Sequence, residues 1–244
     1  MANKKFEFTG ETKTVCGVTL HRIRAIVDIA YAKAGEIGGW IESERNLSEY
    51  GNAWVSGNAE VYGDAWVSGD ARVYGNAWVS GNARVYGDAE VYGNAWVYGN
   101  ARVYGNARVY GDAEVYGNAE VYGNARVYGD AEVYGNAWVY GNAWVSGDAR
   151  VSGDARVSGD ARVYGDAEVC GNADYIVFKN CWSSMRWFTY TRSNKMWKVG
   201  CFHGTGEELV KKAYADSEKS GRCYEAIVRA VEAIEDAMNE KKED

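Results

Sequence analysis

Polar and apolar positions alternate along the middle of the chain in a six-residue unit that repeats from Gly51 to Gly171. The unit reads Gly, Asn or Asp, Ala, then Trp, Glu or Arg, Val, and finally Tyr or Ser, with Cys170 in the last slot. Ala and Val lie two residues apart, which is the period of a β-strand and places both on one face. Glycine followed by Asn or Asp adopts left-handed backbone angles at little cost and predicts a corner. Strands and corners at a fixed interval predict a solenoid.

The number of sides in each coil is implied by a resemblance. The spacing of Val and Ala is similar to the hexapeptide pattern of left-handed parallel β-helices, which wind three hexapeptides, or about 18 residues, into a triangular coil. The resemblance implies a mainly β protein that contains a single-stranded left-handed parallel β-helix, in which equivalent residues of successive coils stack about 4.8 Å apart. The chain contains no proline, which suits central strands that need every backbone N–H.

The chain divides into three predicted regions. Residues 1–50 do not follow the repeat and predict an N-terminal β cap, because the open end of a solenoid is a sheet edge that invites aggregation. Residues 51–171 predict the β-helix itself, and residues 172–244 predict a small C-terminal α+β module.

Short strands and two helices are predicted in the C-terminal module. A turn at Ser193-Asn194 predicts a hairpin, and Thr205 with Glu208 forms a capping box that predicts the start of a helix. A second helix is predicted from Cys223, with one apolar stripe. The predicted strands are residues 175–179, 186–191 and 196–201, and the stripe is Ile227, Val231, Ile234 and Met238.

Both flanks resemble known proteins. The segments LHRIRA (residues 20–25), KAGEIGGWIES (33–43) and NLSEYGNAWV (46–55) resemble the opening of YdcK-like β-solenoid proteins, a hexapeptide-repeat family of bacteria and their phages. The run FTYTRSNKMWKVGCFHGTGEEL (188–209) is similar to the tail domains of phage and prophage hexapeptide proteins. These resemblances imply a β-solenoid architecture and an association with phages or prophages.

Tyrosines occupy the last slot of the unit through the middle of the repeat, whereas serines mostly occupy it near both ends. Stacking by coils turns these tyrosines into columns that form a girdle. Stacked aromatic pairs stabilise neighbouring strands by about 0.2–1 kcal/mol each, which favours a structural role. A broad aromatic surface also fits self-association of the chain into a homo-oligomer. The girdle residues are Tyr74, Tyr92, Tyr110 and Tyr128, then Tyr98, Tyr116 and Tyr134, and finally Tyr86, Tyr104, Tyr122 and Tyr140.

An acidic column is predicted at one set of corners. Four carboxylates in a row could hold cations or a basic partner, but arginines of the same region can neutralise them, so we expect a solvated and self-paired surface. The column is Asp112, Asp130, Asp148 and Asp166, and the arginines are Arg150, Arg156 and Arg162.

Charge and composition narrow the class of protein. The net charge is −7, and the region from Gly51 to Cys170 accounts for it, with 8 Arg against 6 Glu and 9 Asp (8 − 15 = −7). An acidic body argues against general nucleic-acid binding. No apolar run is long enough to predict a membrane span. The 5 cysteines form no CxxC pair and predict free thiols in the cytoplasm of a bacterial host cell.

Many left-handed β-helices are acyltransferases, which use a histidine on the helix and a loop that encloses the acyl donor. The repeat from Gly51 to Gly171 has no inserted loop, no His and no Lys, and the two histidines, His21 and His203, lie in the flanks. We therefore predict no catalytic residue, no cofactor and no metal site. Acyl transfer stays open as an alternative, as does a phage-encoded inhibitor that sequesters a host defence factor.

The irregular C-terminal module is the predicted site of partner recognition. Repeating surfaces cannot distinguish one side from another, whereas a specific protein partner needs aromatic and Arg anchors that occur once. We therefore predict a non-enzymatic scaffold with a protein partner at this module. The candidate residues are Trp182, Arg186, Trp187, Arg192, Trp197, Phe202 and His203.

Overall fold

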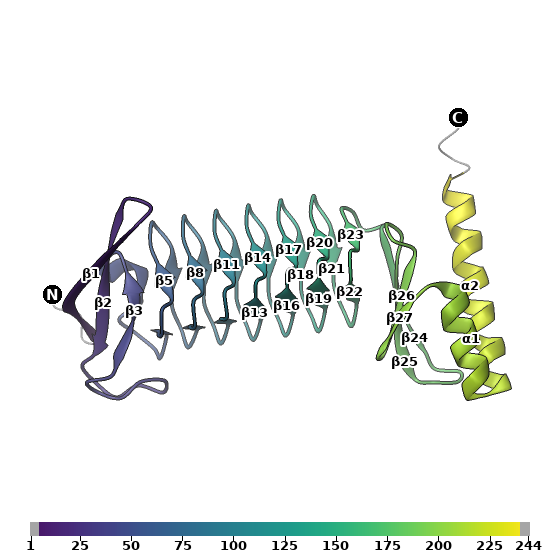
Figure 1. Ribbon diagram of the computed structural model, residues 1–244, viewed down its shortest axis with the longest axis horizontal. Coiled ribbons are helices and arrows are strands. Elements are labelled where there is room, and N and C mark those ends of the chain that lie inside the picture. The colour runs from purple at the N-terminus through teal and green to yellow at the C-terminus, as the bar shows by residue number, and fades with distance from the viewer. Residues whose placement is uncertain (1–4, 240–244) are drawn as a thin grey trace. The chain divides into compact units, whose positions relative to one another are not determined.

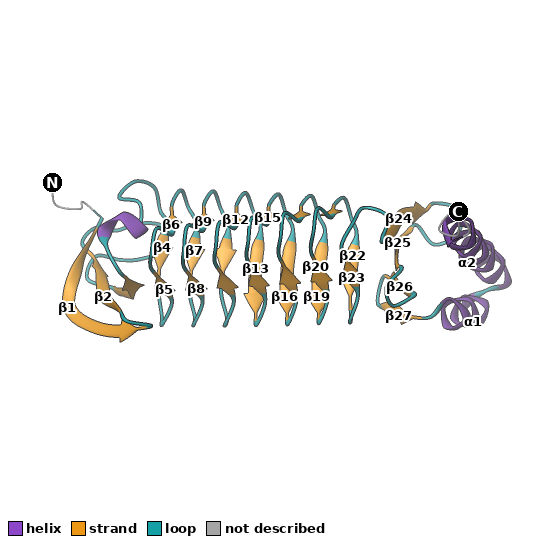
Figure 2. Cartoon of the chain, turned by 90° about the horizontal axis from the view of Figure 1, so that it is seen from above, coloured by secondary structure: helices purple, strands orange, loops and turns teal. Residues whose placement is uncertain are grey.

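The computed structural model describes residues 5–239, and the chain splits into two compact units after Asn172. The first unit holds the cap and the solenoid together, and the second is the C-terminal module. Figures 1 and 2 show the coils of the first unit in succession, each carrying short strands joined by turns.

Three parallel sheets form the sides of the solenoid, as the repeat predicts. In the repeat, each strand pairs in parallel with the strand 18 residues away, for example Val91 with Val109 and Val97 with Val115. The fold class and the coil length are therefore confirmed. The hand of the coil stays a prediction of the resemblance.

The strands of each side are short. The first sheet contains β1 (Phe6–Val15), β2 (Val18–Ala25), β3 (Ile37–Ile41), β5 (Glu60–Val61), β8 (Trp78–Val79), β11 (Trp96–Val97), β14 (Glu114–Val115), β17 (Glu132–Val133), β20 (Arg150–Val151) and β23 (Glu168–Val169). The second contains β4 (Trp54–Val55), β7 (Arg72–Val73), β10 (Glu90–Val91), β13 (Arg108–Gly111), β16 (Arg126–Gly129), β19 (Trp144–Gly147) and β22 (Arg162–Tyr164). The third contains β6 (Trp66–Val67), β9 (Arg84–Val85), β12 (Arg102–Val103), β15 (Glu120–Val121), β18 (Trp138–Val139) and β21 (Arg156–Val157).

Alanine and valine fill the interior of the solenoid at every level. None of these repeat side chains is more than 1% exposed. Successive coils are joined by backbone hydrogen bonds, such as Arg102 N to Ala119 O at 2.9 Å and Tyr104 N to Val121 O at 3.0 Å. The burial pattern of the repeat is thus the predicted one, with small aliphatic side chains inside and the larger ones on the outer face, where Trp54 is nevertheless only 2% exposed.

Glycine is required at the corners for two reasons. The corner glycines from Gly51 to Gly165 have φ between 59° and 75°, the left-handed region that disfavours other residues. They also stack closely, because a Cβ on Gly93 would lie 2.9 Å from the backbone nitrogen of Gly111. Backbone angle therefore fixes the first slot of the unit, and space also fixes it where another coil stacks closely, which is not the case at Gly159.

The cap extends the first sheet of the solenoid. Strand β1 pairs with β2 antiparallel, and β3 is antiparallel to β2 but parallel to β5, with Trp40 opposite Glu60. The solenoid thus begins at β3, before the first hexapeptide at Gly51. Lys5 is buried beneath this cap and donates to the carbonyl oxygen of Ala53 at 2.9 Å. Because burial disfavours its charged form, the pKa of Lys5 is lowered to about 8.

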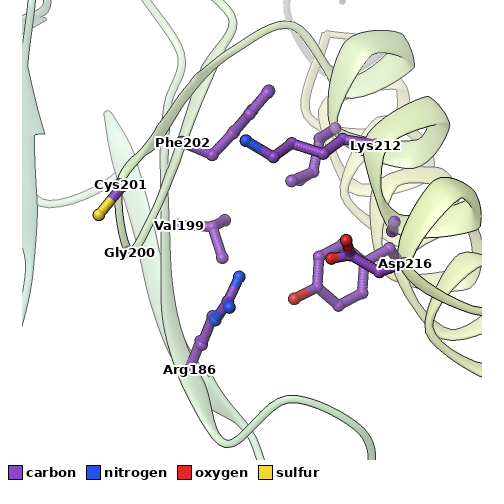
Figure 3. A pocket seen from close by; sticks show the side chains of 10 residues that line it. Arg186, Val199, Gly200, Cys201, Phe202, Lys212 and Asp216 are labelled. Atoms are coloured by element: carbon purple, nitrogen blue, oxygen red, sulfur yellow. The ribbon is translucent and has the colours of Figure 1, made fainter.

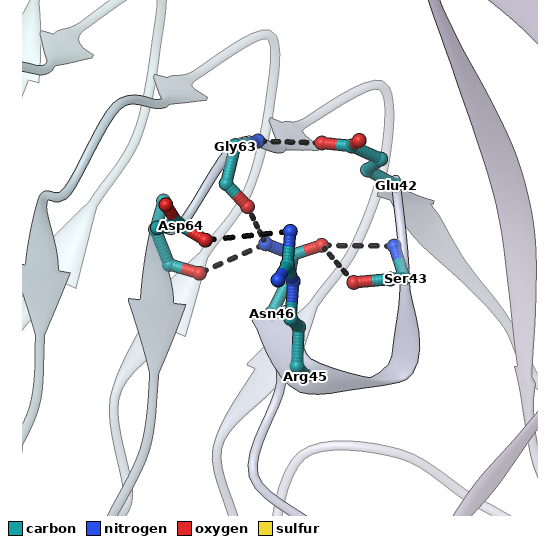
Figure 4. A network of polar contacts seen from close by, with 7 residues as sticks. Glu42, Ser43, Arg45, Asn46, Gly63 and Asp64 are labelled. Carbon is teal, nitrogen blue, oxygen red and sulfur yellow. Dashed lines mark hydrogen bonds and ion pairs between the residues drawn. The ribbon is translucent and has the colours of Figure 1, made fainter.

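A buried asparagine ties the cap to the first coils (Figure 4). The Asn46 amide nitrogen donates to the carbonyl oxygens of Gly63 and Ala65, both at 2.9 Å. Its amide oxygen accepts from the backbone nitrogen of Ser43 at 2.9 Å and from the Ser43 hydroxyl at 3.2 Å. Asn46 ends the short 3-10 helix η1 (Glu44–Asn46). The asparagine thereby satisfies two carbonyl groups that the irregular cap would otherwise leave unpaired.

The C-terminal module is an antiparallel meander with two helices. Its elements are β24 (Tyr175–Asn180), β25 (Arg186–Thr191), β26 (Met196–Val199), β27 (Phe202–Gly204), α1 (Gly206–Asp216) and α2 (Glu218–Asn239). The capping box is present, with Thr205 accepting from Glu208 N at 3.3 Å and Glu208 accepting from Thr205 N at 2.9 Å. The predicted third strand corresponds to β26 and ends two residues early, at Val199, because Gly200 adopts a φ of 57° and turns the chain into β27, which was not predicted.

The second helix differs from its prediction. It begins at Glu218 rather than at Cys223. The predicted apolar stripe extends beyond the core, because Ile234 and Met238 are 47% and 37% exposed. The core of the module ends at Val231, so later residues of the stripe have no apolar surface to cover. This core consists of Phe188, Tyr190, Trp197, Val199, Leu209, Ala213, Tyr224, Ile227, Val228 and Val231.

Candidate functional site

The tyrosine girdle forms stacked ladders on all three sides of the solenoid. Rings 18 residues apart lie parallel, with centroids separated by 4.8–5.0 Å and interplanar angles of 1–4°. The side chains are half-buried against their neighbours. The ladders join Tyr74, Tyr92, Tyr110 and Tyr128, then Tyr98, Tyr116 and Tyr134, and finally Tyr86, Tyr104, Tyr122 and Tyr140.

Several girdle hydroxyls donate to glutamates of the next coil. Tyr98 bonds Glu114 at 3.0 Å, and Tyr116 bonds Glu132 at 3.0 Å. Burial and then the bond to Glu114 raise the pKa of Tyr98 to about 12. The same two causes raise the pKa of Tyr116 above its usual range. The polar ends of these rings are therefore satisfied within the chain.

The acidic column lies exposed at one corner, as its spacing predicts. Asn94, one coil earlier, donates to Asp112 at 2.9 Å and continues the column as an amide ladder. We expected the arginines to pair with the aspartates of the column. Arg150 instead forms its ion pairs with Glu132 at 3.4 Å and Glu168 at 3.7 Å. These glutamates occupy the same slot as Arg150 on neighbouring coils and point from the same side. The other column members are Asp130, Asp148 and Asp166.

Arginines of the same region also contact aromatic rings. The Arg156 guanidinium lies 4.7 Å from the ring centroid of Trp138, and that of Arg162 lies 4.5 Å from Trp144. Both arginines occupy the strand slot of the hexapeptide, which places them on the sides of the solenoid beside these rings.

A hairpin turn in the C-terminal module presents two exposed apolar side chains. Trp182 is 70% exposed and Met185 is 60% exposed, in the turn that joins β24 to β25. The turn is built on Asn180, whose buried amide oxygen accepts from the backbone nitrogens of Trp182 at 3.0 Å and Ser183 at 3.2 Å. The Asn180 amide nitrogen donates to the Ser183 hydroxyl at 3.0 Å. Trp182 is thus displayed on an ordered turn.

The other predicted recognition residues divide between surface and core. Arg186 is exposed and Trp187 is 37% exposed, while Arg192 is partly buried and paired with Glu235 at 3.2 Å. Trp197, a candidate for partner recognition, belongs to the module's own core, because it is 2% exposed and packs against Phe188 and Tyr190. Phe202 and His203 lie half-buried on β27. Met185 was not named from the sequence as a candidate for partner recognition. Its position directly after two serines, which favour a turn, was the signal that could have identified it as exposed.

A cavity of about 310 Å³ opens between the sheet and the helices of this module (Figure 3). Figure 3 shows the Arg186 side chain extending towards it from β25, and the Lys212 side chain extending from α1 towards Phe202. The Lys212 ammonium lies 5.7 Å from the Phe202 ring centroid. The lining residues are Arg186, Val199, Gly200, Cys201, Phe202, Leu209, Lys212, Ala213, Asp216 and Tyr224. This cavity was not predicted from the sequence, although two of its lining residues, Arg186 and Phe202, were among the candidates for partner recognition.

The described residues contain no cluster of three or more His, Cys, Asp and Glu side chains that could hold a metal ion. His21 lies in the cap, with its ring centroid 4.8 Å from that of Phe8, and His203 lies in the C-terminal module. In the part of the chain that the structure describes, no helix has the length and apolarity needed to cross a membrane.

Comparison with protein families agrees with the geometry of the coils. The family described as YdcK Beta solenoid repeat matches ten segments that together cover residues 65–117 and 119–171. These segments coincide with successive coils of parallel strands. A comparison with curated proteins finds no match. The repeats of this chain therefore belong to the YdcK β-solenoid repeat family.

Proposed function

We propose that this chain is a non-enzymatic β-solenoid scaffold that recognises a protein partner through its C-terminal module. The observation that carries the proposal is Trp182, a large apolar side chain left 70% exposed on a turn that the buried Asn180 holds in place. Binding energy at protein interfaces is concentrated in a few aromatic and Arg side chains. Trp182, Met185 and Arg186 supply such a group within five consecutive residues.

An ordered turn makes this group a better anchor than its exposure alone would. A turn whose backbone is already fixed loses less conformational entropy on binding, so more of the contact energy appears as affinity. The hydrogen bonds of Asn180 to Trp182 and Ser183 provide that order. The hairpin thus presents apolar area on a turn whose backbone is held by hydrogen bonds.

The solenoid supports the scaffold half of the proposal. Its interior contains only Ala and Val in the repeat, and the sides between Trp54 and Val169 carry no inserted loop in which a donor molecule could be enclosed. The girdle tyrosines that donate to glutamates have their polar groups satisfied within the chain. We therefore assign these ladders a structural role. A phage-encoded inhibitor would be one form of the same partner binding.

Capture from a bacterial lysate tests the proposal. The full chain and its Trp182→Ala and Met185→Ala variants would serve as bait, with captured proteins identified by mass spectrometry. The matched control is Trp96→Ala, which removes a Trp that is 42% exposed on the solenoid. We expect loss of a specific partner with the hairpin variants and retention with the control. The reverse pattern would place recognition on the solenoid and overturn the proposal.

A further inference from the structure

The cavity beside the hairpin contains polar groups that no other described residue satisfies. Tyr224 is only 5% exposed and lines the cavity, yet its hydroxyl has no hydrogen-bond partner among the described residues. The Arg186 guanidinium and the Lys212 ammonium also lack hydrogen-bond and ion-pair partners in the described part of the chain. These three groups line the cavity and are available to bond a ligand there.

The charges around the cavity favour an anion. Arg186 and Lys212 contribute two positive charges and Asp216 one negative charge, so the lining sums to +1 (2 − 1). One carboxylate would neutralise this sum. Arginine also binds carboxylates through two parallel hydrogen bonds, for which the unpaired guanidinium is available. The hydroxyl of Tyr224 can donate a further hydrogen bond to the same group.

The remaining lining residues favour an apolar group next to that anion. Val199, Leu209 and Phe202 supply aliphatic and aromatic surface. A volume of about 310 Å³ lies at the lower end of the range for small-ligand sites and suits one side chain rather than a large cofactor. Arg186 belongs both to the end of the hairpin turn and to the cavity wall. A partner seated on the hairpin would therefore also reach the cavity.

We infer that the cavity receives a carboxylate-bearing apolar segment of the protein partner, an inference that rests on the proposed function. Arg186 and Lys212 hold the carboxylate, Tyr224 donates to it, and Val199, Leu209 and Phe202 contact the apolar group. An acidic segment that carries an aromatic or aliphatic side chain has this chemistry. A dianion without apolar surface, such as phosphate, would leave the apolar wall uncovered.

The test uses 3-phenylpropionate as a probe of the full chain, followed by methyl NMR. We expect saturable shifts of the Val199 and Leu209 methyl signals, with those of Val109 in the solenoid unchanged. The neutral analogue 3-phenylpropanamide is the matched ligand control and should bind at least about tenfold more weakly, because it lacks the charge-assisted hydrogen bonds. Equal binding of the amide, or binding of inorganic phosphate in preference to the probe, would overturn the inference.

Variants identify the groups that hold the probe. Arg186→Gln should weaken binding at least about tenfold, and Tyr224→Phe should weaken it by about two- to tenfold. Lys211→Gln removes an exposed charge next to Lys212 that does not line the cavity and should have no effect. Because Arg186 is exposed, its replacement leaves the core intact even if Tyr224→Phe destabilises the module. Unchanged binding by Arg186→Gln would contradict the assignment.

The probe experiment and the lysate experiment test the cavity and the proposed function independently of each other. Probe binding together with hairpin-independent capture would reject the proposed function and retain the cavity as a carboxylate site. Trp182-dependent capture without probe binding would retain the partner function and reject the cavity as its acid-binding part.

Discussion

Tyr104 donates its phenolic hydrogen to Glu120 on the next coil at 2.9 Å, while its ring stacks on Tyr86 and Tyr122 at 4.8 and 4.9 Å. One side chain therefore connects three successive coils. Its apolar faces are covered by equivalent rings and its polar end is satisfied by a carboxylate. This arrangement explains why tyrosine, and not a purely apolar ring, fills the girdle.

Replacing Tyr92, Tyr110 and Tyr128 with Ser should destabilise the solenoid without changing its mass in solution. The change removes three stacked pairs, including the pair of Tyr92 with Tyr74. At about 0.2–1 kcal/mol per pair, the free energy of unfolding should fall by roughly 0.6–3 kcal/mol. Thermal unfolding and light scattering measure the two quantities. A fall in mass would show that the girdle is an interface between copies of the chain.

Alkaline pH should destabilise the solenoid through the same tyrosines. The pKa of Tyr98 is raised from 10.0 to about 12, by burial first and then by its bond to Glu114. Between these values the unfolded chain loses the proton while the folded chain keeps it, so stability falls as pH rises from about 10 to about 12. Below pH 10.0 this contribution is fully present.

Tyr98→Phe is the control for this effect, because it keeps the ring and removes the titrating group. Its decline in stability across the same pH window should be smaller than that of the parent chain. Chemical unfolding at stepped pH, together with the tyrosinate absorbance, gives both quantities. An identical decline in the two proteins would exclude the Tyr98 hydroxyl as a contributor.

Two corner glycines separate the cost of backbone angle from the cost of crowding. At Gly159, φ is 64° and nothing lies within 4 Å of an added Cβ, so Gly159→Ala should cost only the left-handed conformation, about 1–2 kcal/mol. At Gly93, φ is 73° and the Cβ would meet the Gly111 backbone at 2.9 Å. Gly93→Ala should therefore reduce the free energy of unfolding by clearly more. Equal losses in urea titrations would show that the coils move apart readily.

The repeat allowed most of the solenoid to be predicted, because its period fixes which residues face inward and which stack. The start of the solenoid was harder to place. Trp40 and Ile41 pair in parallel with β5, as the strands of the repeat pair with one another. They are preceded by Gly38-Gly39, however, and not by the Gly, Asn or Asp, and Ala of the hexapeptide. The residue pattern before Gly51 therefore does not indicate that β3 pairs with β5.

The C-terminal site was predicted only in part. Composition identified Trp182 and Arg186 as candidates, but the same reasoning included Trp197, which belongs to the core. The packing of the sheet against the helices decides which aromatic side chains are buried. This packing cannot be predicted from the residue type alone. The cavity depends on the same packing, because Tyr224 and Phe202 meet there from separate elements.

Equivalent coils allow the length of this solenoid to vary in whole steps. Because residues 18 apart pair in the repeat with identical register, gain or loss of one whole coil keeps each core position and each outer ladder in line. A change of a single hexapeptide also preserves the core, but it moves all later side chains to the neighbouring side and breaks the ladders. The fold therefore tolerates a change of length in steps of one coil, about 4.8 Å each, without rearranging its core or its outer surface.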